Sequence, residues 1–353
     1  MAVPSTQRAL LITEIGQPLT IVTDRPIPQP GPNQIQIKVS IAGPNPHDQL
    51  SRDIGLFVED AIPAAITNDV VGTVTALGSN VTTFSIGDQV FGQSSFEKDS
   101  PQNGSQEYCV LDSAFTAKIP AGVSADEAAT LPVNASTSAI SLFDGANLAI
   151  PAPWTPAATT FDYAAQSLLI IGGGTSCGKF GVQLAALAGI GTIVVVGGPE
   201  AELRSYGATH VLSRHLTYED TLAQIRAIVH DDLLYAYDTA NPPEGQILAI
   251  NALSSSARGR FARLLPIGPV DESKIDAGVK EVGFELCDVH GSCHGHGELT
   301  AGFWERLPGW LSEGKIRPGR FEIDDGGLDA DRWNKLLDRY RDYEPVIKTH
   351  FHF

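Results

Sequence analysis

The spacing of the hydrophobic residues changes near residue 126. Before this point, apolar residues alternate or cluster with β-branched residues in short runs, which Pro- or Gly-rich segments such as 26–32 and 78–80 separate. This pattern is typical of short strands joined by turns. It predicts strands at residues 9–13, 20–23, 34–41, 70–77, 107–110 and 115–119. Together they indicate a small, irregular, barrel-like β domain.

Helices and buried strands follow in the rest of the chain. Residues 126–145 have helical spacing, which Pro132 interrupts. Four apolar residues at 168–171 run into a glycine cluster, and apolar residues then recur at near-helical spacing up to Leu187. This is the pattern of a buried parallel strand, a tight turn and an amphipathic helix. The remaining pattern predicts strands at 193–196, 206–212, 233–238 and 261–267, and helices at 246–253, 303–316 and 330–340.

The glycine cluster is the first candidate for a function. Gly172 and Gly173 allow the backbone to turn with unusual φ angles, and Gly178 lets the helix lie close to the strand. The helix would then direct unpaired N–H groups and the positive end of its dipole at a pyrophosphate. The candidate cofactor-binding residues here are Gly172, Gly173, Gly174, Thr175, Ser176, Cys177, Gly178 and Lys179.

Composition narrows the range of partners. The formal net charge of −17 argues against nucleic acids and anionic membranes, since both require a basic surface. The four cysteines are too few and too scattered for a disulfide framework. The first residues lack the pattern of a secretory signal, and no apolar run reaches the ~18 residues of a membrane span. We therefore expect a cytoplasmic protein, monomeric or homodimeric, that acts on a small molecule.

Several motifs in a fixed order carry a family resemblance. The segments GTVTALGSNV at 72–81, SIGDQV at 85–90 and AATLPV at 128–133 precede the glycine turn. From about residue 9 to about residue 315, the chain resembles the medium-chain dehydrogenase/reductase superfamily. It is similar above all to the zinc-independent quinone reductases and to the fungal trans-acting enoyl reductases. The Pro-rich insert at 150–154 is similar to that of the fungal enzymes. The resemblance implies an α/β fold, with a GroES-like β-rich catalytic domain (1–135 and 305–353) and a doubly wound Rossmann-type cofactor domain (136–304).

The positions of the zinc ligands in metal-dependent members of the superfamily can be compared with the residues of this chain. Zinc-dependent members place a Cys in the segment that here reads 41–48, and His-Glu where this chain has Asn68 and Asp69. Neither Pro44 nor Asn68 is a usual zinc ligand, and residues 91–107 lack the cysteines of the structural zinc lobe. We therefore expect no metal. Without a Lewis acid, an acceptor that is already activated fits better than a simple ketone.

A second cluster of ligand-type side chains lies at Cys287, His290, Cys293, His294 and His296. The residue types are those of zinc ligands, but the spacing matches no closed tetrahedral pattern. The resemblance instead puts this segment after a late strand of the cofactor domain, beside the active cleft. Both interpretations, a metal site and a cleft loop, stay open at this point.

The resemblance also suggests residues for the reaction. Asn45 and Asp48 match an Asn-Pro-x-Asp pattern that lines the cleft in zinc-independent relatives, although both residue types also stabilise turns. Thr137 matches a family Thr close to the nicotinamide ring. No convincing general acid is evident: His47 is one candidate, and water is the alternative.

The identity of the cofactor is less strongly indicated. No acidic residue lies directly at the tip of the strand at 193–196, where NAD-preferring sites usually bind the ribose 2′-hydroxyl. This favours NADPH, with NADH not excluded. The nearest basic residue is Arg204, which could equally be a solvated helix residue. Gly198, Arg204, Tyr218 and Ile267 complete the candidate cofactor-binding residues.

These observations lead to an NADPH-dependent reduction of an activated alkene. The substrate expected from the resemblance is an acyl or polyketide-type molecule, free or bound to a carrier protein. A quinone or another conjugated carbonyl compound is the alternative substrate. Thr175, where many relatives have Gly or Ser, and the short loop at 199–205 keep two other functions open: nucleotide binding without turnover, and a redox-neutral cyclisation.

Overall fold

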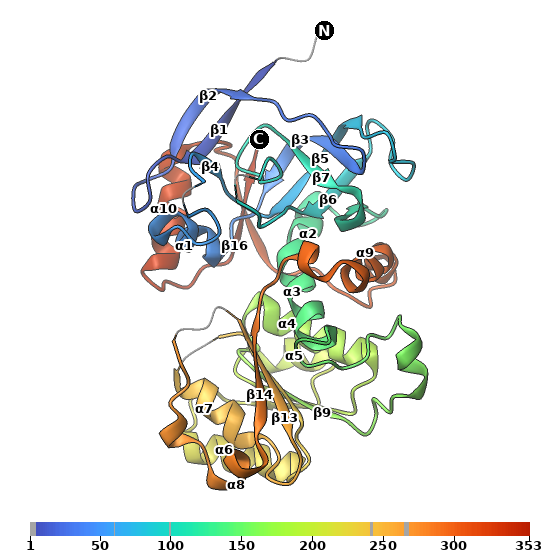
Figure 1. The fold of residues 1–353 in the computed structure, drawn as a ribbon, viewed down its shortest axis with the longest axis vertical. Helices are drawn as coiled ribbons and strands as arrows, with labels where there is room; N and C mark the ends of the chain where they lie inside the picture. The colour runs from blue at the N-terminus through green and yellow to red at the C-terminus, as the bar shows by residue number, and fades with distance from the viewer. Residues whose placement is uncertain (1–4, 60, 99, 241–242, 265–267) are drawn as a thin grey trace.

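A six-stranded parallel sheet forms the centre of the lower lobe in Figure 1. The computed structural model describes residues 5–59, 61–98, 100–240, 243–264 and 268–353. The strand order is β11 (His210–Leu212), β10 (Thr192–Val196), β9 (Ser167–Ile171), β12 (Tyr235–Asp238), β13 (Gly259–Leu264) and β14 (Phe284–Val289). The first of these strands in the sequence, β9, therefore lies in the middle of the sheet. The next two strands lie on one side of β9, and the last three lie on its other side, as in a doubly wound fold.

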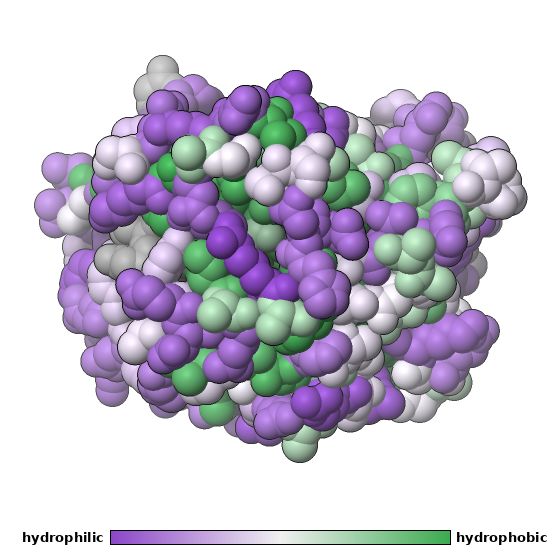
Figure 2. Space-filling model, turned by 90° about the horizontal axis from the view of Figure 1, so that it is seen from below, coloured by the Kyte–Doolittle hydropathy of each residue, from purple (hydrophilic) through white to green (hydrophobic). Residues whose placement is uncertain are grey.

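Helices cover this sheet and present a polar surface. They are α4 (Ser176–Ala188), α5 (Glu200–Ser205), α6 (Tyr218–Val229), α7 (Pro243–Ala252) and α8 (Ala277–Val282). Helix α4 begins at Thr175, whose side chain accepts a hydrogen bond from Gly178 N, and ends at the left-handed Gly189. Seen from below, the surface of this lobe is mostly hydrophilic, with hydrophobic residues scattered among the polar ones (Figure 2).

The upper lobe is rich in β structure and contains both ends of the described chain (Figure 1). Its larger sheet has the order β15 (Phe321–Asp324), β16 (Lys348–His352), β3 (Gln34–Ala42), β5 (Asp69–Leu77), β6 (Gln89–Gln93) and β8 (Thr116–Lys118), and β7 (Tyr108–Asp112) pairs with β3. A smaller sheet contains β2 (Thr20–Pro26), β1 (Thr6–Ile12) and β4 (Ala64–Ala65). The helices of this lobe are α1 (Pro46–Ile54), α2 (Ala125–Ala129) and α10 (Ala330–Arg341).

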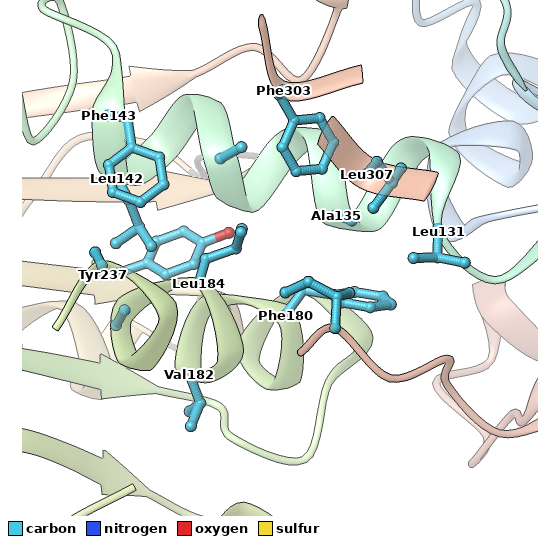
Figure 3. Close-up of a cluster of buried hydrophobic side chains, with 14 of the residues drawn as sticks. Leu131, Ala135, Leu142, Phe143, Phe180, Val182, Leu184, Tyr237, Phe303 and Leu307 are labelled. Atoms are coloured by element: carbon cyan, nitrogen blue, oxygen red, sulfur yellow. The ribbon is translucent and has the colours of Figure 1, made fainter. Parts of the chain in front are cut away.

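Two helices connect the lobes: α3 (Pro132–Phe143) and α9 (Gly297–Ser312). Apolar side chains of α3, α4 and α9 meet in one buried cluster, in which Phe180 and Phe303 are almost fully inaccessible (Figure 3). Pro132 starts α3, so the break expected at this residue is confirmed. The domain boundaries proposed at 135/136 and 304/305 fall inside α3 and α9, and they stay a prediction.

The α/β fold, the parallel sheet and the glycine-turn unit are confirmed, whereas several other elements were not expected. The sequence analysis predicted no helix at α1, α6 or α8 and no strand at β4, β15 or β16. The strand expected at 261–267 ends at Leu264 in the structure, and the last three of these residues lie outside the described part.

A buried ion pair joins the C-terminal strand to the centre of the upper lobe. The ammonium group of Lys348 on β16 donates to the carboxylate of Asp69 on β5, to the carbonyl oxygen of Gly43 (2.8 Å) and to Asn45 Oδ1 (2.9 Å). The side chains of Asp69 and Lys348 are 0% and 6% exposed. A buried charge is tolerated only when it is paired and hydrogen-bonded, and both charges here meet that condition.

Replacing Lys348 by Met should therefore destabilise the protein strongly. The change leaves the Asp69 carboxylate buried without its countercharge, and we expect a loss of about 3–5 kcal/mol in the free energy of unfolding, measured by urea denaturation. Arg332→Met is the matched control, because Arg332 forms an exposed ion pair with Asp324. That loss should stay below about 1 kcal/mol. Equal losses in the two variants would contradict the role given to the buried pair.

Candidate functional site

The turn between β9 and α4 accepts only glycine at its two ends. Gly172 has a φ of +88°, and a Cβ at this position would lie 2.6 Å from the hydroxyl of Thr239. A Cβ at Gly178 would overlap the carbonyl oxygen of Gly172. The Thr175 hydroxyl donates to Thr239 Oγ1 (2.8 Å), and the Thr239 hydroxyl donates to the carbonyl oxygen of Ile171 (2.9 Å). The helix therefore lies directly on the strand, as phosphate-binding turns require.

An open hollow lies beside the N-terminal end of α4. Its walls come from the glycine turn and from segments of the chain that lead back to the upper lobe: Gly174, Ser176, Lys179, Arg317, Arg320 and Lys348. Lys179 is paired with Glu202 at 2.9 Å. Within the described part of the chain, Arg320 has no ion pair. The helix dipole and these cations together make the hollow attractive to an anion, despite the acidity of the whole chain.

The glycine turn is linked to the Asn-Pro-x-Asp segment through α3. Cys177 Sγ lies 3.4 Å from Asn134 Oδ1, and Asn134 Nδ2 donates to Asn45 Oδ1 (3.2 Å). Asn45 Nδ2 in turn donates to Asp69 (2.8 Å). Burial raises the pKa of the Cys177 thiol to about 12, so this side chain is a neutral thiol and not a nucleophilic thiolate. The structure thus joins the predicted site residues Cys177 and Asn45 through one buried chain of polar contacts.

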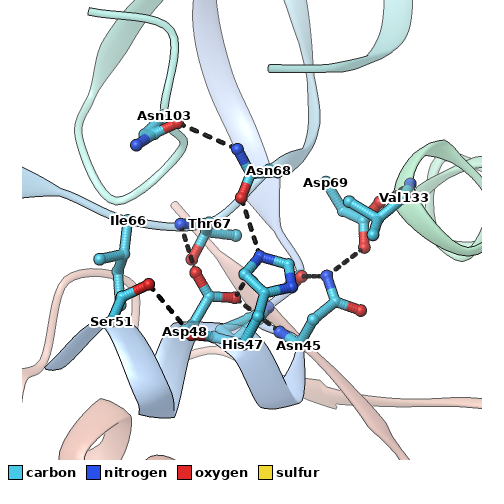
Figure 4. A network of polar contacts seen from close by, with 12 residues as sticks. Asn45, His47, Asp48, Ser51, Ile66, Thr67, Asn68, Asp69, Asn103 and Val133 are labelled. Carbon is cyan, nitrogen blue, oxygen red and sulfur yellow. Dashed lines mark hydrogen bonds and ion pairs between the residues drawn. The ribbon is translucent and has the colours of Figure 1, made fainter. Parts of the chain in front are cut away.

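The carboxylate of Asp48 is occupied by backbone donors. It accepts hydrogen bonds from the N–H groups of Asn45 and Thr67, each at 2.7 Å, and forms a capping box at the start of α1 (Figure 4). Asp48 is 1% exposed. It therefore holds α1 against the segment before β5 and has no free oxygen to offer to a substrate.

Thr137 is covered by the loop that follows β14. The residue lies on α3 and is buried, and a Cβ at Gly291 would overlap its hydroxyl. Gln93 of β6 holds this loop: its Nε2 donates to the carbonyl oxygen of Gly291 (2.9 Å), and its Oε1 accepts from the N–H of Cys293 (2.7 Å). The two lobes therefore meet directly at Thr137.

The cysteine and histidine cluster after β14 does not converge on one point. His294 pairs with Asp112, His296 Nδ1 bonds Asp144 (2.8 Å), and Cys293 accepts from the indole N–H of Trp304 (3.3 Å). Among the residues that the structure describes, no group of three or more His, Cys, Asp or Glu side chains could hold a metal ion. These contacts favour the cleft-loop interpretation of the segment.

The candidate residues for the adenosine end of the cofactor are partly brought together. Gly198 packs against the glycine turn, where its Cβ would lie 2.6 Å from Gly174 N. Arg204 bonds Glu200 (2.8 Å) and the carbonyl oxygen of Thr209 (2.9 Å). Tyr218 begins α6, and its hydroxyl accepts from Asn251 (2.7 Å). Ile267 lies outside the described residues.

The sequence analysis missed Arg214. This residue follows β11, and its Cβ lies 3.3 Å from the position of a Cβ on Gly197, at the end of β10. In the described part of the chain, its guanidinium has no hydrogen bond or ion pair. The available signal was its position: the ends of parallel strands gather at the cofactor edge of a doubly wound sheet.

Comparisons with known proteins agree with this architecture. Residues 31–137 match the family described as "Alcohol dehydrogenase GroES-like domain". The chain is 31% identical to the trans-enoyl reductase tndF of Aspergillus flavipes over 74% of this chain and 76% of that protein. It is 28% identical to the trans-enoyl reductase RAP2 of Pyricularia oryzae over 94% of both. It is also 37% identical to the dehydrogenase pigH of Monascus ruber, over 49% of this chain and 47% of that protein.

Solved structures share the fold at low sequence identity. The CurK enoyl reductase superposes with a TM-score of 0.76 and 19% identity, covering 98% of each chain or more. The quinone oxidoreductase of Pseudomonas syringae superposes with a TM-score of 0.75 and 19% identity, over 98% of this chain and 100% of that one. A mycobacterial protein complexed with NADPH superposes with a TM-score of 0.72 and 21% identity, over 98% and 100%.

Together the fold, the site and these relatives define an oxidoreductase. The chain belongs to the medium-chain dehydrogenase/reductase superfamily, and to its zinc-independent branch. None of the described helices combines the length and the apolar character that crossing a membrane requires.

Gly178→Ala should abolish tight dinucleotide binding. The new methyl group collides with the Gly172 carbonyl and pushes α4 away from the turn, so the backbone N–H groups no longer converge. We expect the affinity for NADPH, measured by fluorescence titration, to fall at least about tenfold, or about 1.4 kcal/mol. Gly309→Ala on α9 is the control, because a Cβ there meets nothing within 4 Å. Unchanged binding by a folded Gly178→Ala variant would mean that the phosphates bind elsewhere.

Proposed function

We propose that this protein is an NADPH-dependent enoyl reductase that reduces the activated alkene of an acyl or polyketide-type substrate. The observation that carries the proposal is the chain of contacts from the glycine turn through Cys177 and Asn134 to Asn45, which joins the candidate dinucleotide-binding turn to the Asn-Pro-x-Asp segment of the upper lobe. The names of the relatives support the reaction class, since two of them are trans-enoyl reductases.

The residues of the turn fit a nicotinamide dinucleotide. The positions of Gly172 and Gly178 leave no room for a Cβ, and the N-terminal end of α4 faces a hollow whose walls include Arg317 and Arg320. These groups would bind the two phosphates. The bound cofactor would supply the hydride. The protein then needs only to orient the alkene, exclude water and provide a proton.

The donor set of the cleft fits an acceptor that is already activated. Asn68, at the position of a zinc ligand in metal-dependent relatives, uses its amide nitrogen on Ser94, Ser95 and Asn103. Pro44 offers no side-chain ligand. Amide and hydroxyl groups in these positions orient a carbonyl group but polarise it less than a metal ion would. A carbon–carbon double bond conjugated to a thioester carbonyl meets that requirement.

The preference for NADPH is proposed to rest on Arg214. The side chain lies against Gly197 at the end of β10, beside the region where a ribose 2′-phosphate would bind, and its guanidinium is free to form charge-assisted bonds. Arg204 is less suited to this task, because Glu200 and Thr209 already occupy its donors.

The test of the proposed reaction compares two acceptor classes. The purified protein should consume NADPH with an α,β-unsaturated acyl thioester, and kcat/KM should exceed the value for a quinone at least about tenfold, which is about 1.4 kcal/mol in transition-state stabilisation. Product analysis should show the saturated thioester. Turnover of the quinone alone would make the protein a quinone reductase, and binding of NADPH without consumption of either acceptor would refute a redox function.

Arg214→Ala should weaken the binding of NADPH and leave that of NADH nearly unchanged. The loss of charge-assisted bonds to the 2′-phosphate corresponds to about 1.5–3 kcal/mol, or about 10- to 150-fold in Kd. Fluorescence titration with both nucleotides measures the ratio. Arg204→Ala is the matched control and should change the ratio less than threefold, because its side chain is held by Glu200. A larger effect at Arg204 would reverse the assignment.

A further inference from the structure

An imidazole lies between aromatic rings at the edge of the cleft. His47, in the first turn of α1, is 7% exposed, and its ring centroid lies 5.1 Å from that of Phe96 and 6.0 Å from that of Phe57. His290 of the lower lobe completes the group, 5.1 Å from Phe57. Phe57 has a left-handed φ of +66°, a conformation that such a residue rarely adopts. The ring cluster therefore spans both lobes and is held in place at some conformational cost.

The hydrogen bond to Asn68 determines the tautomer of His47. Asn68 Nδ2 donates to the carbonyl oxygen of Ser95 (2.9 Å). A carbonyl oxygen can only accept, so this contact fixes the orientation of the Asn68 amide and places Asn68 Oδ1 toward His47. This oxygen lies 2.9 Å from His47 Nε2 (Figure 4). An amide oxygen can only accept, and Nε2 must therefore carry a hydrogen. In the neutral ring, the lone pair is on Nδ1.

The Nδ1 atom of His47 is the open side of the ring. It has no hydrogen-bond partner among the described residues, and it is absent from the set of fully buried polar atoms without a partner. The atom is therefore not fully buried, although the side chain as a whole is only 7% exposed. The opposite nitrogen is fixed to the protein, so the ring can gain or lose a proton at Nδ1 without reorienting.

The other titratable groups near His47 already have hydrogen-bond partners within the protein. Asp48 and Asp69 accept from backbone N–H groups, and Lys348 is bonded to Asp69. Burial raises the pKa of Cys177 to about 12, and it raises that of Tyr340, whose hydroxyl donates to the carbonyl oxygen of Pro44. These groups are therefore poor sources of a proton at neutral pH.

Two ionisable groups face His47 itself. The carboxylate of Asp48, on the same helix, lies 3.7 Å from Nε2. His290, on the segment packed against His47 from the lower lobe, would oppose a positive charge on that ring if His290 were protonated. Partial burial lowers the pKa of His290, so this ring is neutral at neutral pH. Phe57 and Phe96 contribute no charge.

We propose that His47 is the general acid of the reaction and donates the proton on Nδ1 to the α-carbon of the substrate. The assignment rests on the proposed enoyl reduction. Hydride addition at the β-carbon shifts the electron pair of the double bond toward the carbonyl group and gives an enolate. The α-carbon then forms a bond to the Nδ1 proton, and the N–H bond breaks. The ring is left as the neutral Nε2–H tautomer that Asn68 stabilises, and solvent water reprotonates it.

His47→Gln tests this assignment. We expect kcat for the enoyl thioester to fall about 100-fold, as for the loss of a general acid, while Kd for NADPH changes less than twofold. In D2O, the native enzyme should deuterate one face of the α-carbon, and the variant should lose this selectivity.

His290→Gln is the matched control, since it removes the other imidazole of the ring cluster. This variant should keep the facial selectivity of deuteration and most of the rate, whatever its KM. A His47→Gln variant that retains the rate or the selectivity would overturn the assignment and leave the proposed function intact. Absence of turnover in the native protein would refute the proposed function, and this assignment with it.

A measurement on the native protein covers the case in which the variant does not fold. In ¹⁵N NMR spectra at alkaline pH, the neutral ring of His47 should show the Nε2–H tautomer, with Nδ1 as the unprotonated nitrogen. The Nδ1–H tautomer would overturn the assignment, because Nδ1 would then not be the site that has released its proton.

Discussion

The buried carboxylate of Asp69 is the interaction on which the site depends. It accepts from the N–H of Val133 at the start of α3 (2.6 Å), from the side chain of Asn45 just before α1, and from Lys348 on the C-terminal strand. Three segments that are far apart in the sequence therefore donate hydrogen bonds to the two oxygens of this carboxylate. A carboxylate at the N-terminal end of a helix is also stabilised by the helix dipole. Because α3 continues into the lower lobe, this one group positions the Asn-Pro-x-Asp segment relative to the glycine turn.

The burial of the Asp69 charge also explains why asparagine side chains gather in this part of the structure. A buried charge requires complete hydrogen bonding, and Asn side chains offer a donor and an acceptor on one small group. Asn45 donates to Asp69 and accepts from Lys348 and Asn134. Asn68 uses its nitrogen on a carbonyl group and its oxygen on an imidazole. Each amide is fixed in orientation by its partners, so the cleft is preorganised before any ligand enters.

Sequence reasoning predicted the elements whose pattern is local. The strand at β9 and the glycine turn were evident because an apolar run and three glycines stand next to one another. Helix α1 was missed because hydrophobic periodicity detects a helix by its buried apolar residues. The buried residues of α1 are all polar or charged: His47, Asp48, Gln49, Ser51 and Arg52. β16 was missed for the same reason: it buries Lys348 and His350 against Asp69 and Asp126, from distant parts of the chain. Arg214 was overlooked because its contact with Gly197 forms only where the ends of strands β10 and β11 lie side by side in the sheet.

These misses have a common physical origin, and it bears on the chemistry. Polar residues are buried only where partners satisfy them, and such partners come from other elements of the fold. The places where hydrophobic patterning fails are therefore the places where the fold has assembled a polar network, here at the junction of the two lobes. In that network the carboxylates and the ammonium group neutralise one another. Among the described residues, this network leaves the rings of Phe57 and Phe96 and the Nδ1 atom of His47 without polar partners, which suits the flat, uncharged conjugated group of the substrate proposed above.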